Sequence, residues 1–210
     1  LGNGQSQWIT GPAARADGHA WRARACAVLT GIGTVRDDDP MLDVREVPVT
    51  RQPHLVVVDS RLETPVSARL FQPAAHSLSR RVLIYCAHPD AQRRDALERL
   101  GATVVCLPNA QGKVDLPAML GDLAAREVNE LHLEAGHLLN GSFLREGLVD
   151  ELLLYVAPQL LGSGGKGLSS WGPLQSLDER LNLDIRSVEP VGPDLRILAR
   201  VQGRDAFLHA

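Results

Sequence analysis

Short runs of apolar, often β-branched residues recur along the chain, and segments with helical spacing separate them. Continuous apolar runs of this length are typical of strands that are covered on both faces of a sheet. The pattern predicts strands at residues 25–29, 54–59, 81–86, 103–107, 130–134 and 151–156.

Helix signals lie between several of these runs. Thr10 precedes Pro12, and proline is favoured in the first turn of a helix, so the Ala- and Arg-rich stretch 12–24 is expected to be helical. Further helices are expected over residues 89–100 (with Gly101 as the stop), 116–127 and 138–146. Strands that alternate with helices imply βα units and a mostly parallel sheet.

The end of the chain has a different pattern. Residues 181–188 and 194–202 alternate polar and apolar positions, and residues 189–193 separate them. This predicts a β-hairpin with a loop longer than two residues. The fold class that we predict is therefore α/β, with a mostly parallel central sheet flanked by helices and an antiparallel C-terminal hairpin. A length of 210 residues favours one such domain.

Composition narrows the classes of function. Hydrophobic residues make up 44% of the chain and charged residues 22%, as in ordinary soluble proteins. A net charge of −3 and an aromatic content of 4% argue against nucleic acid as a partner. No apolar run approaches the ~20 residues that span a bilayer, so no membrane partner is expected.

The cysteines are Cys26, Cys86 and Cys106, and none has a CxxC or Cys/His ligand spacing. We therefore expect no metal site of the structural zinc type. An odd number of cysteines without a secretion signal indicates reduced thiols and a cytoplasmic location.

Two polar segments near the N-terminus are candidates for ligand binding. In Ser6–Pro12, a tryptophan beside hydroxyls could stack on a flat ring, although a capped helix with a Trp anchor is the more common arrangement. In Thr30–Pro40, a strand that ends in TGxGT exposes backbone N–H groups to a phosphate or ribose; a solvated turn is the alternative. The acids Asp37–Asp39 are a metal candidate, but no histidine or second acid cluster supports it.

Two later segments have a similar character. In Val56–Arg61, a hydroxyl and a guanidinium leave the end of a strand together, which suits a terminal phosphate or is an ordinary turn. In Glu134–Ser142, a strand, a glycine and a helix start follow one another, which is the geometry that holds a pyrophosphate, although the Rossmann fingerprint is absent. His137 in that segment has the character of a capping or solvent-facing residue. In the loop Gly162–Gly172, Lys166 faces either a ligand or only solvent.

Taken together, these segments resemble the reductase domain of the bacterial bifunctional riboflavin-biosynthesis deaminase/reductase. The resemblance spans about residues 2–200 and includes the signatures TVxxDDPxLxxR and EAGxxLxGxFL. The matching pieces are SQWITGPAAR (6–15), HAWRARACAVLTGIGTVRDDDPMLDVR (19–45), VVDSRLETP (57–65), EAGHLLNGSFL (134–144) and VDELLLYVAPQLLG (149–162).

The resemblance implies a dihydrofolate-reductase-like fold and NADPH as the cofactor. The implied reaction reduces 5-amino-6-(5-phosphoribosylamino)uracil to the ribitylamino compound: the sugar opens to a Schiff base, and C1′ then receives a hydride. In such an enzyme the protein aligns the substrate with the cofactor, and the cofactor donates the hydride. Two other interpretations stay open, namely another pteridine or pyrimidine reductase of the same fold and a non-catalytic nucleotide-binding module.

The resemblance also implies the site residues. The implied cofactor contacts are Trp8, Thr34, Asp38, Ser60, Gly136, His137, Leu138, Leu139, Asn140, Gly141 and Ser142. The implied substrate contacts are Ser6, Arg22, Leu42, Arg45 and Glu134, and no residue is assigned as the catalytic proton donor.

Some of these assignments agree with the residue chemistry. Two guanidiniums at Arg22 and Arg45 suit a phosphate, and Glu134 suits the pyrimidine or ribose. The alternative is that these arginines are surface residues paired with Asp17, Asp43 or Glu46. His137 departs from the family pattern, in which proline or a small residue is frequent, but backbone contacts would survive that change.

The resemblance has consequences for organisation as well. It implies that residues 1–210 form a single reductase domain, a C-terminal fragment without the family's first strand and without the zinc deaminase domain of the parent chain. A homodimer is expected, because related reductase domains usually pair. Candidate interface residues are the apolar positions Leu152, Leu154, Val156, Leu183 and Ile185, whose alternative role is to pack the domain's own core.

Overall fold

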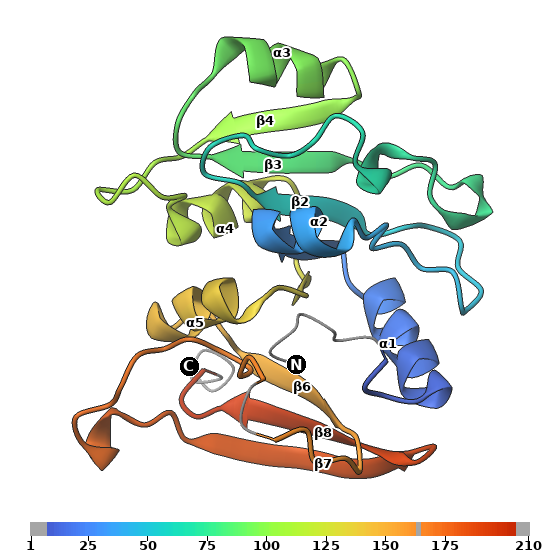
Figure 1. Ribbon diagram of the computed structural model, residues 1–210, viewed down its shortest axis with the longest axis vertical. Coiled ribbons are helices and arrows are strands. Elements are labelled where there is room, and N and C mark those ends of the chain that lie inside the picture. The colour runs from blue at the N-terminus through green and yellow to red at the C-terminus, as the bar shows by residue number, and fades with distance from the viewer. Residues whose placement is uncertain (1–7, 163–164, 205–210) are drawn as a thin grey trace. The chain divides into compact units, whose positions relative to one another are not determined.

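The computed structural model describes residues 8–162 and 165–204 (Figure 1). The chain divides into two compact units. Residues 19–136 form the first, which we call the parallel unit. Residues 1–18 and 137–210 form the second, which we call the antiparallel unit. Helix α1 (Pro12–Arg24) begins in the antiparallel unit and ends in the parallel unit.

The parallel unit is built on a five-stranded sheet in the order β4-β3-β2-β1-β5. All neighbouring strands run parallel. Every residue of the valine- and leucine-rich strands β1 and β3 is buried, as continuous apolar runs require. The strands are β1 (Ala27–Gly31), β2 (His54–Val58), β3 (Val82–Cys86), β4 (Ala102–Cys106) and β5 (Leu131–Leu133), which confirms the expected runs with small shifts of their ends.

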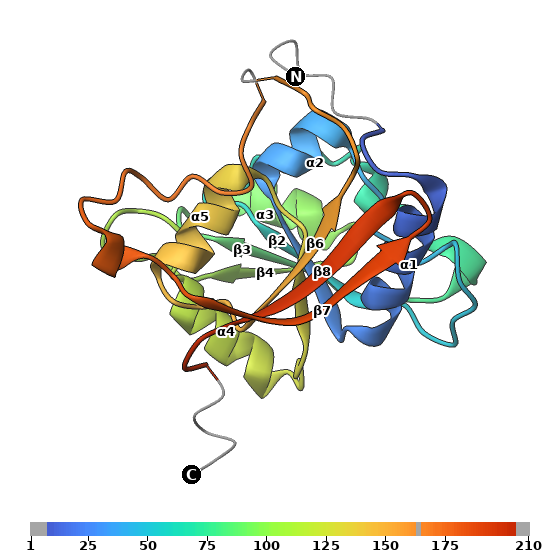
Figure 2. The same ribbon diagram turned by 90° about the horizontal axis from the view of Figure 1, so that it is seen from below.

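Helices cover both faces of this sheet (Figure 2). On one face, α2 (Ile32–Asp38) and α3 (Ala91–Glu98) contribute Val35 and Leu97 to the main apolar core. On the other face lies α4 (Leu116–Ala125), and the hydroxyl of Tyr85 donates a 2.6 Å hydrogen bond to its Asp122. Both α3 and α4 begin at an aspartate whose side chain accepts a backbone N–H, at Asp90 and Asp115.

Helix α2 differs from the sequence prediction, which expected only a strand end and a turn after residue 30. Gly31 is its extended N-cap, and Asp39 ends it with a left-handed φ of 40°. Burial of Val35 against the sheet stabilises the short helix although glycine and β-branched residues are poor helix formers. Two 3₁₀ turns follow β2, at Arg69–Phe71 (η1) and Ala75–Ser77 (η2).

The antiparallel unit contains a three-stranded sheet in the order β6-β8-β7. Its strands are β6 (Glu151–Val156), β7 (Leu183–Val191) and β8 (Asp194–Val201), and it also contains α5 (His137–Arg145) and a 3₁₀ turn, η3 (Leu177–Glu179). The apolar run at 151–156 therefore pairs antiparallel with β8 and does not extend the parallel sheet.

The hairpin of β7 and β8 is confirmed, but its loop is shorter than expected (Figure 2). Val191 pairs with Asp194, so only Gly192 and Pro193 form the turn. Gly192 supplies a positive φ of 63° at the first turn position, where two-residue hairpins favour glycine. Pro190 fits inside β7 because β7 is an edge strand and needs no N–H donor on its outer side.

None of the helices in residues 8–162 and 165–204 is long and apolar enough to cross a membrane.

Candidate functional site

An ion pair between Arg22 and Glu134 is at the centre of the site in the parallel unit. Arg22 lies in the last turns of α1, and Glu134 follows β5 directly. The guanidinium donates to both carboxylate oxygens of Glu134, from Nε at 2.5 Å and from Nη2 at 2.6 Å. Its Nη1 donates to the backbone carbonyl of Asp43 at 3.3 Å, and Nε2 of His132 lies 3.3 Å from Oε1 of Glu134.

Electrostatics keep this carboxyl group ionised. Burial alone would raise the pKa of Glu134, but hydrogen bonds from Arg22 and His132 outweigh it and lower the pKa to about 2. For Arg22, burial opposes the charged form, and the bond with Glu134 reverses that effect and raises the pKa of the guanidinium. Glu134 is therefore a fixed hydrogen-bond acceptor at neutral pH and a poor proton donor.

The segment after α2 contains two further expected residues, Leu42 and Arg45, and its Asp43 carbonyl is the one that Arg22 contacts. Leu42 is buried with a φ of 49°, a left-handed conformation that is uncommon for residues other than glycine. The buried carboxylate of Asp43 accepts hydrogen bonds from Nη1 of Arg45 at 2.9 Å and from the backbone N–H of Ala75 at 3.0 Å. Burial raises the pKa of Asp43, but these two donors lower it overall.

Arg45 is the more accessible of the two candidate phosphate ligands. Its side chain is 47% exposed, whereas that of Arg22 is 18% exposed. The pairing of Arg45 with Asp43 is one of the alternatives that the sequence left open; Asp17, another, instead pairs with Arg196 in the antiparallel unit. The phosphate roles of both arginines stay predictions.

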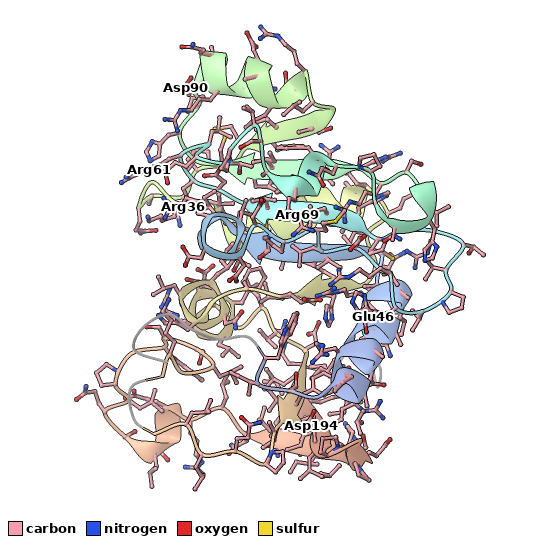
Figure 3. All side chains as sticks on the ribbon, turned by 45° about the vertical axis from the view of Figure 1, so that its right-hand side comes forward. Arg36, Glu46, Arg61, Arg69, Asp90 and Asp194 are labelled. Carbon is pink, nitrogen blue, oxygen red and sulfur yellow. The ribbon has the colours of Figure 1, made fainter. Side chains whose placement is uncertain are left out.

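The expected cofactor residues of the parallel unit follow the carboxyl ends of β1 and β2. Thr34 lies within α2, Asp38 is its last, exposed residue, and Ser60 follows β2. Figure 3 shows Arg36, Arg61 and Asp90 along this edge of the unit. Arg36 pairs with Glu63 at 3.0 Å.

The exposed guanidinium of Arg61 has a different environment. It has no hydrogen-bond partner within the part of the chain that the structure describes. This edge therefore presents a hydroxyl at Ser60 and an unpaired guanidinium at Arg61, and their role in binding a phosphate stays a prediction.

Two buried polar atoms at the same edge could not be assigned from the sequence. Thr30 and Asp59 are both fully buried, and neither Thr30 Oγ1 nor Asp59 Oδ1 has a partner among the described residues. The other carboxylate oxygen of Asp59 accepts bonds from the N–H and hydroxyl of Thr64, both at 2.7 Å. Thr30 pairs with Val57, so Thr30 and Asp59 lie on one face of the sheet. The only sequence signal was their position, each at or just after the end of an apolar run.

The other expected residues belong to the antiparallel unit, except Gly136, which is the last residue of the parallel unit. Ser6 lies outside the described residues. Trp8 is 66% exposed, and the guanidinium of Arg15 stacks over its ring at 4.6 Å. Lys166 is exposed. Asp194 accepts a 2.7 Å bond from the N–H of Gly11, which ties the start of α1 to β8 (Figure 3).

The expected pyrophosphate turn falls on Gly136 and the first turns of α5. The segment before residue 171 packs closely against that helix. The N–H of Ser170 donates to the carbonyl of His137 at 2.8 Å, and Nδ2 of Asn140 donates to the carbonyl of Leu168 at 3.0 Å. A side chain at Gly141 would collide with the backbone of Ser170. In contrast, Gly136 and Leu138 are exposed.

Within residues 8–162 and 165–204, no group of three or more histidine, cysteine, aspartate or glutamate side chains could hold a metal ion. The acids Asp37–Asp39 therefore do not form part of such a group.

A parallel sheet with ligand-type groups at its carboxyl edge, joined to an antiparallel C-terminal hairpin, defines an α/β domain of the dihydrofolate-reductase-like class. The fold class predicted from the sequence is thus confirmed. Residues 1–197 match the model of the RibD C-terminal domain, and the chain belongs to this family.

Solved and curated relatives agree with this assignment. The structure of Acinetobacter baumannii RibD (form 1) superimposes with a TM-score of 0.77 at 30% identity, covering 95% of this chain and 53% of that one. The riboflavin biosynthesis protein RibD of Escherichia coli K12 is 34% identical over 208 residues, which cover 93% of this chain and 54% of the relative. The chain thus spans about half the length of such relatives.

A shorter relative matches over nearly its whole length. The Buchnera aphidicola protein named 5-amino-6-(5-phosphoribosylamino)uracil reductase is 26% identical over 201 residues, covering 93% of this chain and 96% of that protein.

Proposed function

We propose that this domain catalyses the NADPH-dependent reduction of 5-amino-6-(5-phosphoribosylamino)uracil to the 5-phosphoribitylamino product in riboflavin biosynthesis. The observation that carries the proposal is membership of the RibD C-terminal domain family over residues 1–197. The named Buchnera reductase, which the chain matches almost end to end, supports the same activity.

The substrate binds at the Arg22–Glu134 pair. The ionised carboxylate of Glu134 accepts hydrogen bonds from the pyrimidine or the ribose, and Arg22 fixes its orientation with two bonds. Arg45, which is half exposed, contacts the phosphate, where a guanidinium offers a fixed fork of donors. Leu42 and Ser6 complete the substrate contacts.

The cofactor contacts are those that the family resemblance implies: Trp8, Thr34, Asp38, Ser60 and residues 136–142. The donor set at the edge of the parallel unit fits a nicotinamide dinucleotide phosphate. Ser60 and the unpaired Arg61 suit a phosphate, and the unpartnered oxygens of Thr30 and Asp59 suit hydroxyl or amide groups. NADPH, when bound, supplies the hydride that reduces C1′.

The protein's own contribution is to align the substrate with the cofactor. Opening the ribose requires a proton at the ring oxygen, and the opened sugar then presents a Schiff-base carbon. Glu134, whose pKa is lowered to about 2, does not supply that proton. Its part is to hold the substrate in one orientation, which raises the effective concentration of the reacting groups.

In its parent chain this domain follows a deaminase domain, and the whole protein acts in the cytoplasm as a homodimer. Within the antiparallel unit, Val156, Leu183 and Ile185 are exposed by 47%, 39% and 65%, while Leu152 and Leu154 are partly buried. Light scattering of Ile185→Lys and of the unchanged protein tests the dimer. If Ile185→Lys forms a dimer with an unchanged dissociation constant, this face is not part of the interface.

Turnover by the parent protein tests the proposed function. The deaminated phosphoribosylamino pyrimidine should be consumed with oxidation of NADPH in equal amounts, and mass spectrometry should show a product heavier by two hydrogens. Turnover of a pteridine and not of this pyrimidine would favour the related reductase. Binding of NADPH without turnover of either compound would favour a nucleotide-binding module.

A further inference from the structure

Two of the cysteines form a pair that the proposed function does not use. Cys86 ends β3, Cys106 ends β4, and the two are direct partners in the parallel register. Neighbouring strands lie about 4.8 Å apart, and register partners point to the same face. Cys86 is 1% exposed, Cys106 is partly buried, and both are free thiols. Both thiols belong to or pack against the main apolar core of the parallel unit.

The surroundings of Cys86 disfavour its thiolate. Burial raises the pKa of the Cys86 thiol to about 12, and the neighbouring Cys106 and the carboxylate of Asp59 act in the same direction. Only Arg94 opposes this effect among the groups that influence Cys86 most. Because the thiolate is the nucleophile in disulfide exchange, attack by the Cys86 sulfur is slow. A metal ion that forms strong bonds to sulfur can displace the thiol protons, so it reacts with this pair more readily than a disulfide does.

We propose that Cys86 and Cys106 form a two-coordinate site for a soft, thiophilic divalent cation of the Hg²⁺ type. Each thiol releases one proton, two metal–sulfur bonds form, and no electron is transferred. Two positive charges leave as one divalent ion enters, so the net charge of the site does not change. This balance matters because a buried site strongly disfavours any uncompensated charge.

The geometry also selects among cations. Two-coordinate binding needs both sulfurs on one side of the sheet, and register partners on neighbouring strands meet that requirement. Zinc prefers four ligands. The described part of the chain offers no group of three or more ligating side chains, so Zn²⁺ should bind weakly here.

Mercuric ion retention by the full 210-residue chain tests the proposal. Cys26→Ser removes the remaining thiol and leaves only the pair. After incubation with one equivalent of HgCl₂, excess glutathione and gel filtration, this variant should retain one Hg²⁺ per chain by mass spectrometry. Cys26→Ser/Cys106→Ser and Cys26→Ser/Cys86→Ser should bind about a hundredfold more weakly, because one thiol loses the chelate advantage.

Two further measurements separate chelation from misfolding. Circular dichroism melting of each metal-free variant shows whether it is folded, and Cys106→Ser, at the more accessible position, is the primary comparison. Methylmercury, which offers one coordination position, should bind the pair and the single-thiol variants with similar affinity. The proposal is overturned if a folded single-thiol variant retains Hg²⁺ as well as the pair, if the pair binds two ions, or if Zn²⁺ binds equally tightly.

Discussion

Arg22 and Glu134 are 112 residues apart in the chain, yet the guanidinium of one donates to both carboxylate oxygens of the other. The sequence pointed to each as a separate substrate contact. Their pairing changes what each can do: the fork of Arg22 is largely filled, and Glu134 is fixed in its charged form. Arg45, whose side chain is half exposed, is therefore better placed to meet a phosphate.

The pKa of Glu134 predicts a specific loss of stability in acid. This pKa falls from 4.5 to about 2 on folding, so the unfolded chain takes up the proton first as pH decreases. The stabilisation is fully present above about pH 4.5 and disappears as pH falls through about 2. Linkage gives it a size of about 3 kcal/mol. Urea unfolding should therefore show Glu134→Gln less stable than the unchanged chain at pH 7, with the gap narrowing towards pH 2.

Glu130→Gln is the matched control for this measurement. Glu130 also pairs with an arginine of α1, Arg24 at 2.7 Å, but both side chains are well exposed. Exposed pairs contribute about 0–1 kcal/mol, so this variant should follow the unchanged chain closely at every pH. A gap for Glu134→Gln that stays constant from pH 7 to pH 2 would mean that its carboxyl group does not titrate differently in the folded state.

Arg45→Ala tests the phosphate contact. In the parent enzyme it should raise KM for the phosphoribosyl substrate by about 10- to 100-fold, as expected for loss of a charged hydrogen bond. The Kd for NADPH should change little. Arg99→Ala, at an exposed arginine after α3, should leave both constants unchanged. If Arg45→Ala instead weakens NADPH binding at constant KM for the substrate, Arg45 belongs to the cofactor.

Arg61 should determine a preference for NADPH over NADH. Its guanidinium has no partner among residues 8–162 and 165–204, so it can meet the 2′-phosphate without breaking another bond. One charge-assisted hydrogen bond is worth about 1.5–3 kcal/mol, roughly tenfold to a hundredfold in affinity. Calorimetric titration of Arg61→Ala should show that loss for NADPH and little change for NADH. Arg36→Ala removes a guanidinium that is already bonded to Glu63, so it should lower the affinity for NADPH less than Arg61→Ala does. Equal affinity of the unchanged protein for NADPH and NADH refutes the assignment.

Local sequence signals were enough to predict some elements of the fold, whereas others depend on long-range packing. The strands of the parallel unit were predictable because continuous apolar runs are buried on both faces. Helix α2 was not, because Ile32, Gly33 and Thr34 have poor helix propensity and burial of Val35 supplies the stability. The length of the hairpin loop depended on β7 being an edge strand, which tolerates Pro190.

Some features of the candidate site could likewise be predicted from local sequence, and others could not. Its residue types and their positions after strands could be predicted from the motifs, since the carboxyl ends of parallel strands lie at one edge. The contacts could not, because the Arg22–Glu134 pair joins α1 to the end of β5. The unpartnered oxygens of Thr30 and Asp59 were also unpredictable, since burial of a polar atom depends on the packing above it.

Gly141 in α5 should tolerate no side chain. A Cβ there would lie 2.0 Å from the carbonyl oxygen and 2.5 Å from the carbonyl carbon of Ser170. The backbone of Ser170 is held by its bond to His137, so Gly141→Ala must push that segment away from the helix. Overpacking of this kind costs about 1–3 kcal/mol.

Gly121→Ala is the matched control in the interior of α4, where a Cβ meets nothing within 4 Å. Alanine is favoured over glycine in helices, so this variant should gain about 0.5–1 kcal/mol. Urea unfolding of both variants should therefore give changes of opposite sign, and proteolysis should cut residues 165–171 faster in Gly141→Ala alone. Equal stabilisation by the two substitutions would show that residues 168–170 do not pack on α5 in solution.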